Sequence, residues 1–227
     1  MPIPNHSVVP ITKDDIPTIG TFLQNSKLQL AINRFLVHDW PNFPLQKAHY
    51  TRAIEGGVSN PQTTSLKVIN HTSGQPVAHL FYTKKASRFA ENDKPAARKK
   101  EEQTKNEVPV GFAPEVYWAV MNAAKSLEPN FDTDEYIELT HLYVEPSSRR
   151  QGIGSWLLQI AQEAAMDAKL PLTMCSEPNN HDFFANRGFK DTKNADLDLR
   201  NWAASLSGYG VFRISRMVLR DKASDVI

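Results

Sequence analysis

Residues 145–158 read EPSSRRQGIGSWLL and place Gly152 and Gly154 two positions apart, directly after an arginine pair. The preceding residues 136–144, YIELTHLYV, are rich in β-branched and aromatic side chains and are soon followed by a proline, which predicts a buried strand. After the glycines, apolar residues recur at helical spacing to about residue 169, which predicts a helix with one face in the core. The chain therefore passes from a strand through a glycine loop into a helix.

The two glycines stand at the N-terminus of the predicted helix. There the first backbone amides have no partner within the helix, the helix dipole is positive, and glycine lets an anion approach closely. A P-loop needs a lysine after the second glycine, where this chain has Ser155, and a dinucleotide fingerprint needs a third glycine, where it has Leu157. The pattern predicts an anion-binding cradle of another kind.

The composition narrows the class of protein. A chain of 227 residues that is 41% hydrophobic can bury a substantial core as one domain. Its 26 Lys and Arg nearly balance 25 Asp and Glu, so no overall basic field favours nucleic acid or an acidic membrane as a partner. Cys175 is the single cysteine, which excludes an intramolecular disulfide, and no long apolar run suggests secretion or a membrane span. We expect a soluble, cytoplasmic protein.

The rest of the chain reads as alternating helices and strands. Residues 84–107 are polar and mixed in charge, which predicts a mobile insert. The other expected elements, in chain order, are a strand at 7–11, a helix near 14–23, a helical region broken at Pro41 and Pro44 and stopping at Gly56-Gly57, a hairpin of 65–70 with 76–85, a helix from Pro114, a strand at 170–176, a short helix before Gly188, and a terminal strand within 208–220.

The glycine loop carries a resemblance to a known family. Arg149-x-x-Gly152-x-Gly154, after a strand ending LYVEP, resembles the acetyl-CoA pyrophosphate loop of the GNAT N-acetyltransferase superfamily, and SEPNNHDFFANRGF resembles that family's next motif. The resemblance spans nearly the whole chain. It implies an α/β GNAT fold, with a mixed central sheet of about six to seven strands splayed at the acetyl-CoA site and flanked by helices, in a single domain over residues 1–227. The insert, the glycine-loop block and the RMVLR ending look most like a fungal branch of small-molecule GNAT enzymes.

The resemblance implies acetyl-CoA as the acyl donor. The backbone amides of residues 151–155 would then face its pyrophosphate, Arg149 and Arg150 would offer charge-assisted bonds, and residues 142–144 would pair with the pantetheine amides. No metal site is expected, because the His, Asp and Glu residues lack ligand spacing. The expected coenzyme-binding residues are Leu142, Tyr143, Val144, Arg149, Arg150, Gln151, Gly152, Ile153, Gly154, Ser155, Asn180 and Phe184.

Acetyl transfer needs an amine without its proton, so a general base is sought on the predicted strand. Glu138 occupies the position where some family members carry a base glutamate, and alternation places it on one face with Thr140 and Leu142. A structurally paired carboxylate is the alternative interpretation of Glu138. His141 points to the opposite face unless a β-bulge shifts the register, which favours a packed histidine.

The sequence departs from the family pattern at Phe184. Family members often have a tyrosine there that protonates the coenzyme A thiolate, and a phenyl ring has no proton to donate. Water or another group takes that role, or the thiolate leaves unaided; the candidate groups are Ser176, Asn180 and Tyr209. Cys175, on an apolar strand, is expected to be an inert core residue.

The resemblance leaves three functions open. The first is acetylation of a primary amine on a small molecule such as a polyamine, an arylalkylamine or an antibiotic-like compound, by direct transfer in a ternary complex. The second has a protein lysine or N-terminus as acceptor. The third, which the Phe184 substitution keeps open, is a non-catalytic acyl-CoA-binding module. Four aromatic residues lie in regions that wall the acceptor site in this family, which indicates an apolar pocket, although core packing explains any one of them: Trp40, Phe43, Trp202 and Tyr209.

Overall fold

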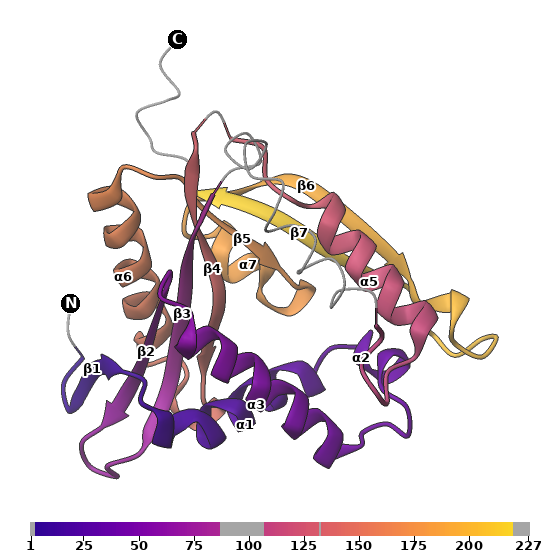
Figure 1. Cartoon of the computed structure of the whole chain (residues 1–227), viewed down its shortest axis with the longest axis horizontal. Helices are drawn as coiled ribbons and strands as arrows, with labels where there is room; N and C mark the ends of the chain where they lie inside the picture. The colour runs from indigo at the N-terminus through magenta and orange to yellow at the C-terminus, as the bar shows by residue number, and fades with distance from the viewer. Residues whose placement is uncertain (1–2, 87–106, 132, 220–227) are drawn as a thin grey trace. The chain divides into compact units, whose positions relative to one another are not determined.

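The computed structural model describes residues 3–86, 107–131 and 133–219. The chain falls into two compact units, each assembled from three separate stretches of sequence. Figure 1 labels the helices and strands along the chain. The first unit comprises Met1–Gln29, Phe43–Lys85 and Ile137–Leu172, and the second comprises Leu30–Asn42, Ala86–Tyr136 and Thr173–Ile227.

Four strands follow one another across the first unit in the order β1, β2, β3, β4. They are β1 (His6–Pro10), β2 (Thr63–Asn70), β3 (Pro76–Ala86) and β4 (Glu135–Val144), of which β4 enters the unit at Ile137. β2 pairs antiparallel with both β1 and β3, in a register that sets Val68 opposite Val8 and Leu80 opposite Leu66. The predicted first strand and the predicted hairpin are therefore confirmed.

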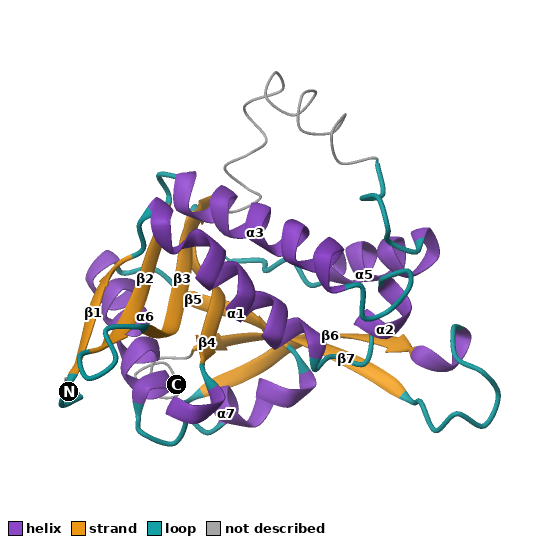
Figure 2. Cartoon of the chain, turned by 90° about the horizontal axis from the view of Figure 1, so that it is seen from below, coloured by secondary structure: helices purple, strands orange, loops and turns teal. Residues whose placement is uncertain are grey.

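Two helices, α1 (Ile16–Leu28) and α3 (Phe43–Ser59), lie side by side (Figure 2) and pack against each other. Their apolar side chains share a core with residues of β3 and β4. Asp15 accepts hydrogen bonds from the backbone N and the Oγ1 of Thr12, both at 2.7 Å, which fixes the entry to α1. The shared core consists of Ile11, Ile16, Ile19, Phe22, Leu23, Tyr50, Ile54, Phe81 and Tyr143.

The predicted stop of α3 at Gly56-Gly57 is wrong, because the helix continues to Ser59. A Cβ built on Gly57 would lie 2.9 Å from Cε1 of Phe81. Real Cβ atoms essentially never come that close to another heavy atom, so a side chain at this position would force α3 away from β3. Gly57 therefore serves the packing of helix on sheet rather than the end of the helix.

The second unit contains three strands in the order β5, β7, β6, with antiparallel pairing of β7 to both neighbours. They are β5 (Leu172–Ser176), β6 (Phe189–Asp198) and β7 (Val211–Leu219), and the helices are α2 (Asn33–Leu36), α5 (Pro114–Ser126) and α7 (His181–Ala185). Pro114 opens α5, as predicted. The buried Arg216 of β7 donates from Nε to the Leu127 carbonyl at 2.8 Å and so holds the end of α5.

β6 is a strand that the sequence pattern does not predict. Most of its side chains are exposed, and its pairing with β7 shifts between Asp191 and Lys193, so no apolar alternation is visible. With β6 the described residues form seven strands, in agreement with the expected six to seven. The predicted α/β fold class is confirmed, whereas the splaying of the sheet at a coenzyme site stays a prediction.

The predicted polar insert at residues 84–107 lies outside the described residues from 87 to 106. Lys84, Lys85 and Ala86 belong to the end of β3. The organisation of residues 1–227 as a single domain stays a prediction.

His79 is a titratable residue buried within the first unit. Its ring stacks on Phe22 and Tyr143, with centroid separations of 6.2 and 5.8 Å. Among the described residues, no hydrogen-bond partner is recorded for either ring nitrogen. Burial, reinforced by the charge of neighbouring His141, lowers the pKa of His79 to about 3, so the fold holds this imidazole neutral.

Replacing His79 should weaken the acid sensitivity of the fold. Because the folded pKa lies below the unfolded value, protonation of His79 favours the unfolded chain. The free energy of unfolding is therefore unaffected by His79 above about pH 6.5 and decreases as pH falls toward 3. His79→Phe keeps an aromatic ring and should gain about 2 kcal/mol over the wild type between pH 8 and pH 5. Urea unfolding at several pH values measures this gain. His71→Phe, at an exposed turn, is the control, and equal pH dependence of His79→Phe and wild type would contradict the prediction.

Candidate functional site

The strand, loop and helix predicted around the two glycines are all present. β4 ends at Val144, a short turn of 3-10 helix occupies Pro146–Ser148, and α6 runs over Ile153–Ala168. Between them the backbone turns through two left-handed conformations, at Arg150 with φ of +63° and at Gly152 with φ of +87°. Glycine is the residue that adopts this conformation without steric cost, so the turn into α6 depends on Gly152.

The N-terminus of α6 offers several backbone amides. The carbonyl of Gly152 accepts from the Trp156 amide at 2.9 Å, which is the first hydrogen bond of the helix. The amides of Ile153 and Gly154 come before this bond and have no acceptor four residues earlier within the helix. A Cβ on Gly152 would contact Cδ1 of Ile3 at 3.7 Å, an ordinary van der Waals separation. The cradle, defined here as residues 151–155, therefore combines backbone donors with the positive end of the helix dipole.

Arg149 fastens the loop to the end of the strand. Its Nε donates to the Val144 carbonyl at 2.9 Å, and its guanidinium carbon lies 5.8 Å from the centroid of the Tyr143 ring. Arg149 and Arg150 are both exposed. The family resemblance implies a phosphate contact for Arg149, which stays a prediction. The anchoring of the loop by Arg149 is not predictable from the sequence, because that bond depends on the fold of the turn.

The three strand residues expected to accompany the coenzyme differ in their surroundings. Tyr143 is buried and its ring packs against Phe22 at a centroid distance of 5.3 Å, so its side chain belongs to the core. Leu142 and Val144 are partly exposed. An extended ligand can pair with these residues through their backbone alone.

Glu138, the predicted base, is 8% exposed and forms an ion pair with Lys85 at the end of β3. A buried carboxylate is costly unless it is paired and hydrogen-bonded, so this contact stabilises the charged form. Lys85 was not singled out in the sequence, because nothing in the pattern of either strand reveals which residues meet across them.

The two predicted faces of β4 are not kept apart. Glu138 contacts Lys85, and His141 contacts Phe81 with ring centroids 5.8 Å apart, although Lys85 and Phe81 share one parity of β3. Between them, Oγ1 of Thr140 donates to the Phe81 carbonyl at 3.2 Å. An interruption of the alternation, such as a β-bulge between Glu138 and His141, accounts for both contacts. His141 has its pKa lowered to about 3, chiefly by burial and then by the charge of Lys27.

The remaining predicted coenzyme residues lie in the second unit. Asn180 ends the turn Pro178–Asn180 before α7, and its amide donates to the Glu177 carbonyl at 3.0 Å. Phe184 is buried against Phe183 and Phe189, with centroids 4.9 and 5.7 Å away. Packing thus gives this phenyl ring a structural role, and contact of Asn180 and Phe184 with a coenzyme stays a prediction.

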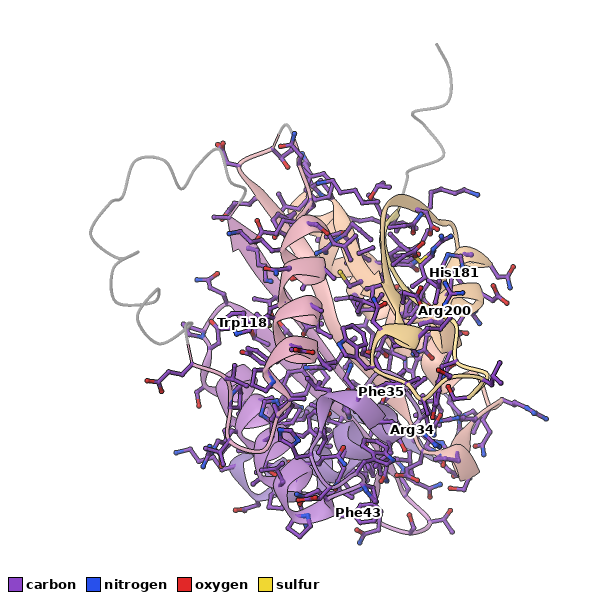
Figure 3. All side chains as sticks on the ribbon, turned by 90° about the vertical axis from the view of Figure 1, so that its right-hand side faces the viewer. Arg34, Phe35, Phe43, Trp118, His181 and Arg200 are labelled. Atoms are coloured by element: carbon purple, nitrogen blue, oxygen red, sulfur yellow. The ribbon has the colours of Figure 1, made fainter. Side chains whose placement is uncertain are left out.

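The two hydroxyls considered as proton donors both have hydrogen-bond partners in the second unit. Oγ of the buried Ser176 donates to the Glu177 carbonyl at 3.2 Å. The Tyr209 hydroxyl accepts from Nη1 of Arg34 at 3.5 Å, and its ring meets Phe35 edge-on at 4.9 Å. Figure 3 shows Arg34 and Phe35, which come from α2. Cys175 is partly exposed on β5.

The four aromatic residues proposed for an acceptor pocket keep some exposure. Phe43, in the first unit, is 55% exposed and lies at the surface (Figure 3). Core packing therefore does not explain Phe43. In the second unit, Trp40, Trp202 and Tyr209 are partly exposed.

The described residues contain neither a cluster of metal ligands nor a helix that could span a membrane. Over residues 3–86, 107–131 and 133–219, no group of three or more His, Cys, Asp or Glu side chains is arranged to hold a metal ion. Within the same part of the chain, every helix is too short or too polar to cross a membrane.

Known proteins resemble this chain in sequence and in fold. A sequence model of the acetyltransferase (GNAT) domain matches residues 97–198. No curated protein sequence matches the chain. Among solved structures, arylalkylamine N-acetyltransferase 2 from Aedes aegypti has a TM-score of 0.64 at 14% identity, over 94% of this chain and 98% of that one.

Two further structures show the same fold. The Drosophila melanogaster polyamine N-acetyltransferase, an enzyme that forms N-acetylagmatine, has a TM-score of 0.61 at 12% identity, with 95% and 100% of the chains covered. A Corynebacterium glutamicum protein described as a histone acetyltransferase HPA2 and related acetyltransferase has a TM-score of 0.54 at 17% identity, with 94% and 95% covered.

Identities this low establish a shared fold alone, and the domain model adds a likeness in sequence over residues 97–198. The glycine loop and α6, on which the resemblance depended, lie within the matched residues. Over residues 97–198 the chain is therefore similar in sequence to the GNAT acetyltransferase domain, and it shares the fold of solved N-acetyltransferases.

Proposed function

We propose that this chain moves the acetyl group of acetyl-CoA to a primary amine of a small molecule, by direct transfer in a ternary complex. The cradle at the start of α6 is the observation that carries the proposal, since its backbone donors and left-handed glycine suit a pyrophosphate. Acetyl-CoA supplies a thioester, which an amine nitrogen attacks.

Residues of the first unit are proposed to bind the coenzyme and to accept the proton of the amine. The cradle binds the diphosphate, and Arg149 holds the loop against Val144 so that the amides keep their direction. The end of β4 offers backbone groups for the pantetheine arm. Glu138 accepts the proton of the incoming ammonium, directly or through one water, and leaves a neutral amine that can attack.

Three observations favour a small-molecule amine as the acceptor of the acetyl group. The net charge of +1 gives no long-range attraction for nucleic acid or another large polyanion. Two proteins with this fold are described as acting on arylalkylamines and on polyamines. The exposed Phe43 supports an apolar wall for such a substrate.

Two other functions remain to be tested. A protein lysine or N-terminus is the second candidate acceptor, and one protein with this fold is described as a histone acetyltransferase. A module that binds acyl-CoA without catalysis is the third, because Phe184 has no proton to give. Membership of the fungal-type branch, a cytoplasmic location and the source of the thiolate proton stay predictions.

A panel of amines tests the function directly. Purified protein is incubated with acetyl-CoA and a polyamine, an arylalkylamine, an aminoglycoside, a lysine peptide or a peptide with a free N-terminus, and released thiol is measured. We expect turnover with small amines well above that with either peptide. Preference for a peptide would favour the protein acceptor, and no turnover with any amine, together with acetyl-CoA binding, would favour the non-catalytic module.

A further inference from the structure

The contact between Lys85 and Glu138 joins two strands of the first unit. Lys85 lies at the end of β3 with 43% of its side chain exposed, whereas 11% of the Glu138 side chain is exposed. The lysine therefore reaches a largely buried carboxylate from the solvent side. Neither the family match nor the glycine loop assigns a role to this lysine.

The strands β3 and β4 and the helix α1 carry other titratable side chains besides Lys85. On β4, His141 lies three residues along, and on β3 His79 lies beyond it; burial keeps both rings neutral. Lys27 of α1 acts on His141. Lys84 neighbours Lys85 but points to the other face of β3, since successive side chains of a strand alternate. The Lys85 ammonium contacts the Glu138 carboxylate directly.

We propose that Lys85 is a positioning residue for acetyl transfer: it holds the Glu138 carboxylate charged and fixed in direction, so that Glu138 is ready to accept the proton of the amine. The proposal rests on the role of Glu138 in the proposed function. It assigns Lys85 no contact with substrate and no proton in the reaction.

The chemistry of a buried carboxylate gives the reason. Removal from water favours the protonated acid, and a cation within hydrogen-bonding distance favours the carboxylate. A base that is already protonated at neutral pH is inactive, so the lysine sets the lowest pH at which Glu138 works. The same attraction weakens Glu138 as a base, so removing the lysine should slow the reaction at low pH and not at high pH.

The test is the pH dependence of kcat/KM in Lys85→Met, with Lys85→Gln as a second neutral variant. The acid limb of the profile should move up by about one pH unit, with a loss of roughly 3- to 10-fold at pH 7 that closes above pH 9. Lys85→Arg should restore the wild-type limb because it keeps the charge. Lys84→Met, which removes a neighbouring charge on the other face, is the matched control and should superimpose on the wild type.

The outcomes separate this inference from the proposed function. If Glu138→Gln is inactive while Lys85→Met superimposes on the wild type, Glu138 remains the base and the role of Lys85 is wrong. If Lys85→Met loses the same factor at every pH, the lysine has a structural role, which also overturns the proposal. If Glu138→Gln is fully active, the assignment of the base fails and the inference fails with it. Melting temperatures of all variants show whether each is folded.

Discussion

Glu138→Gln is expected to lower kcat/KM by about 10²- to 10⁴-fold at neutral pH, the usual contribution of a general base. The amide has the size of the carboxylate but no basic oxygen, so it does not accept the amine proton. Activity should partly recover at high pH, where more of the substrate amine arrives neutral. The affinity for acetyl-CoA should change little, because Glu138 lies outside the cradle.

The measurement is kcat/KM against pH with the best amine of the panel. Glu135→Gln is a matched control, since Glu135 begins the same strand and is exposed. Its profile should superimpose on that of the wild type. A Glu138→Gln variant with near wild-type activity at every pH would remove Glu138 from the mechanism and leave bulk water or His141 as the base.

Gly152→Asp should weaken acetyl-CoA binding by roughly 10- to 10³-fold, which follows from placing one charge about 4 Å from a phosphate near the protein surface. The substitution also forces a side chain onto a backbone with φ of +87°, so the turn itself is strained. Isothermal titration calorimetry with acetyl-CoA measures the change in affinity.

Two further variants separate the effect of backbone strain on acetyl-CoA affinity from the effect of the added charge. Gly152→Ala brings the backbone strain without the charge, so it should bind acetyl-CoA more tightly than Gly152→Asp. Gly74→Asp adds the same charge at another left-handed glycine, in the turn between β2 and β3, where a Cβ would meet nothing within 4 Å. Its affinity should equal that of the wild type. A folded Gly152→Asp protein with undiminished affinity would place the diphosphate elsewhere.

Local features were predictable because their causes lie within a few residues of one another. The glycine loop and α6 follow from apolar periodicity and a glycine at a left-handed position before the helix start. The β2–β3 hairpin follows from two apolar runs around a turn-rich segment.

Features that depend on distant contacts were not predictable. The pairing of Lys85 with Glu138 and the bond of Arg216 to the Leu127 carbonyl each join residues far apart in the sequence. Gly57 reads as a helix stop until Phe81 is seen packed against it. The contact of His141 with Phe81 across β4 and β3 likewise leaves no mark in YIELTHLYV.

β6, which escaped prediction because it is so polar, has a consequence for how the protein behaves in concentrated solution. In the second unit it stands at the end of the strand order, and the outer edge of a strand in such a position is a template on which another chain can pair. The strand is rich in lysine and aspartate, and its register with β7 shifts between Asp191 and Lys193. Arg213 of β7 donates two hydrogen bonds of 2.7 Å to the carboxylate of Asp196. Charge and irregularity of this kind discourage intermolecular strand pairing. We therefore expect the polar composition of β6, which makes the strand hard to predict from the sequence, also to disfavour aggregation of the folded chain.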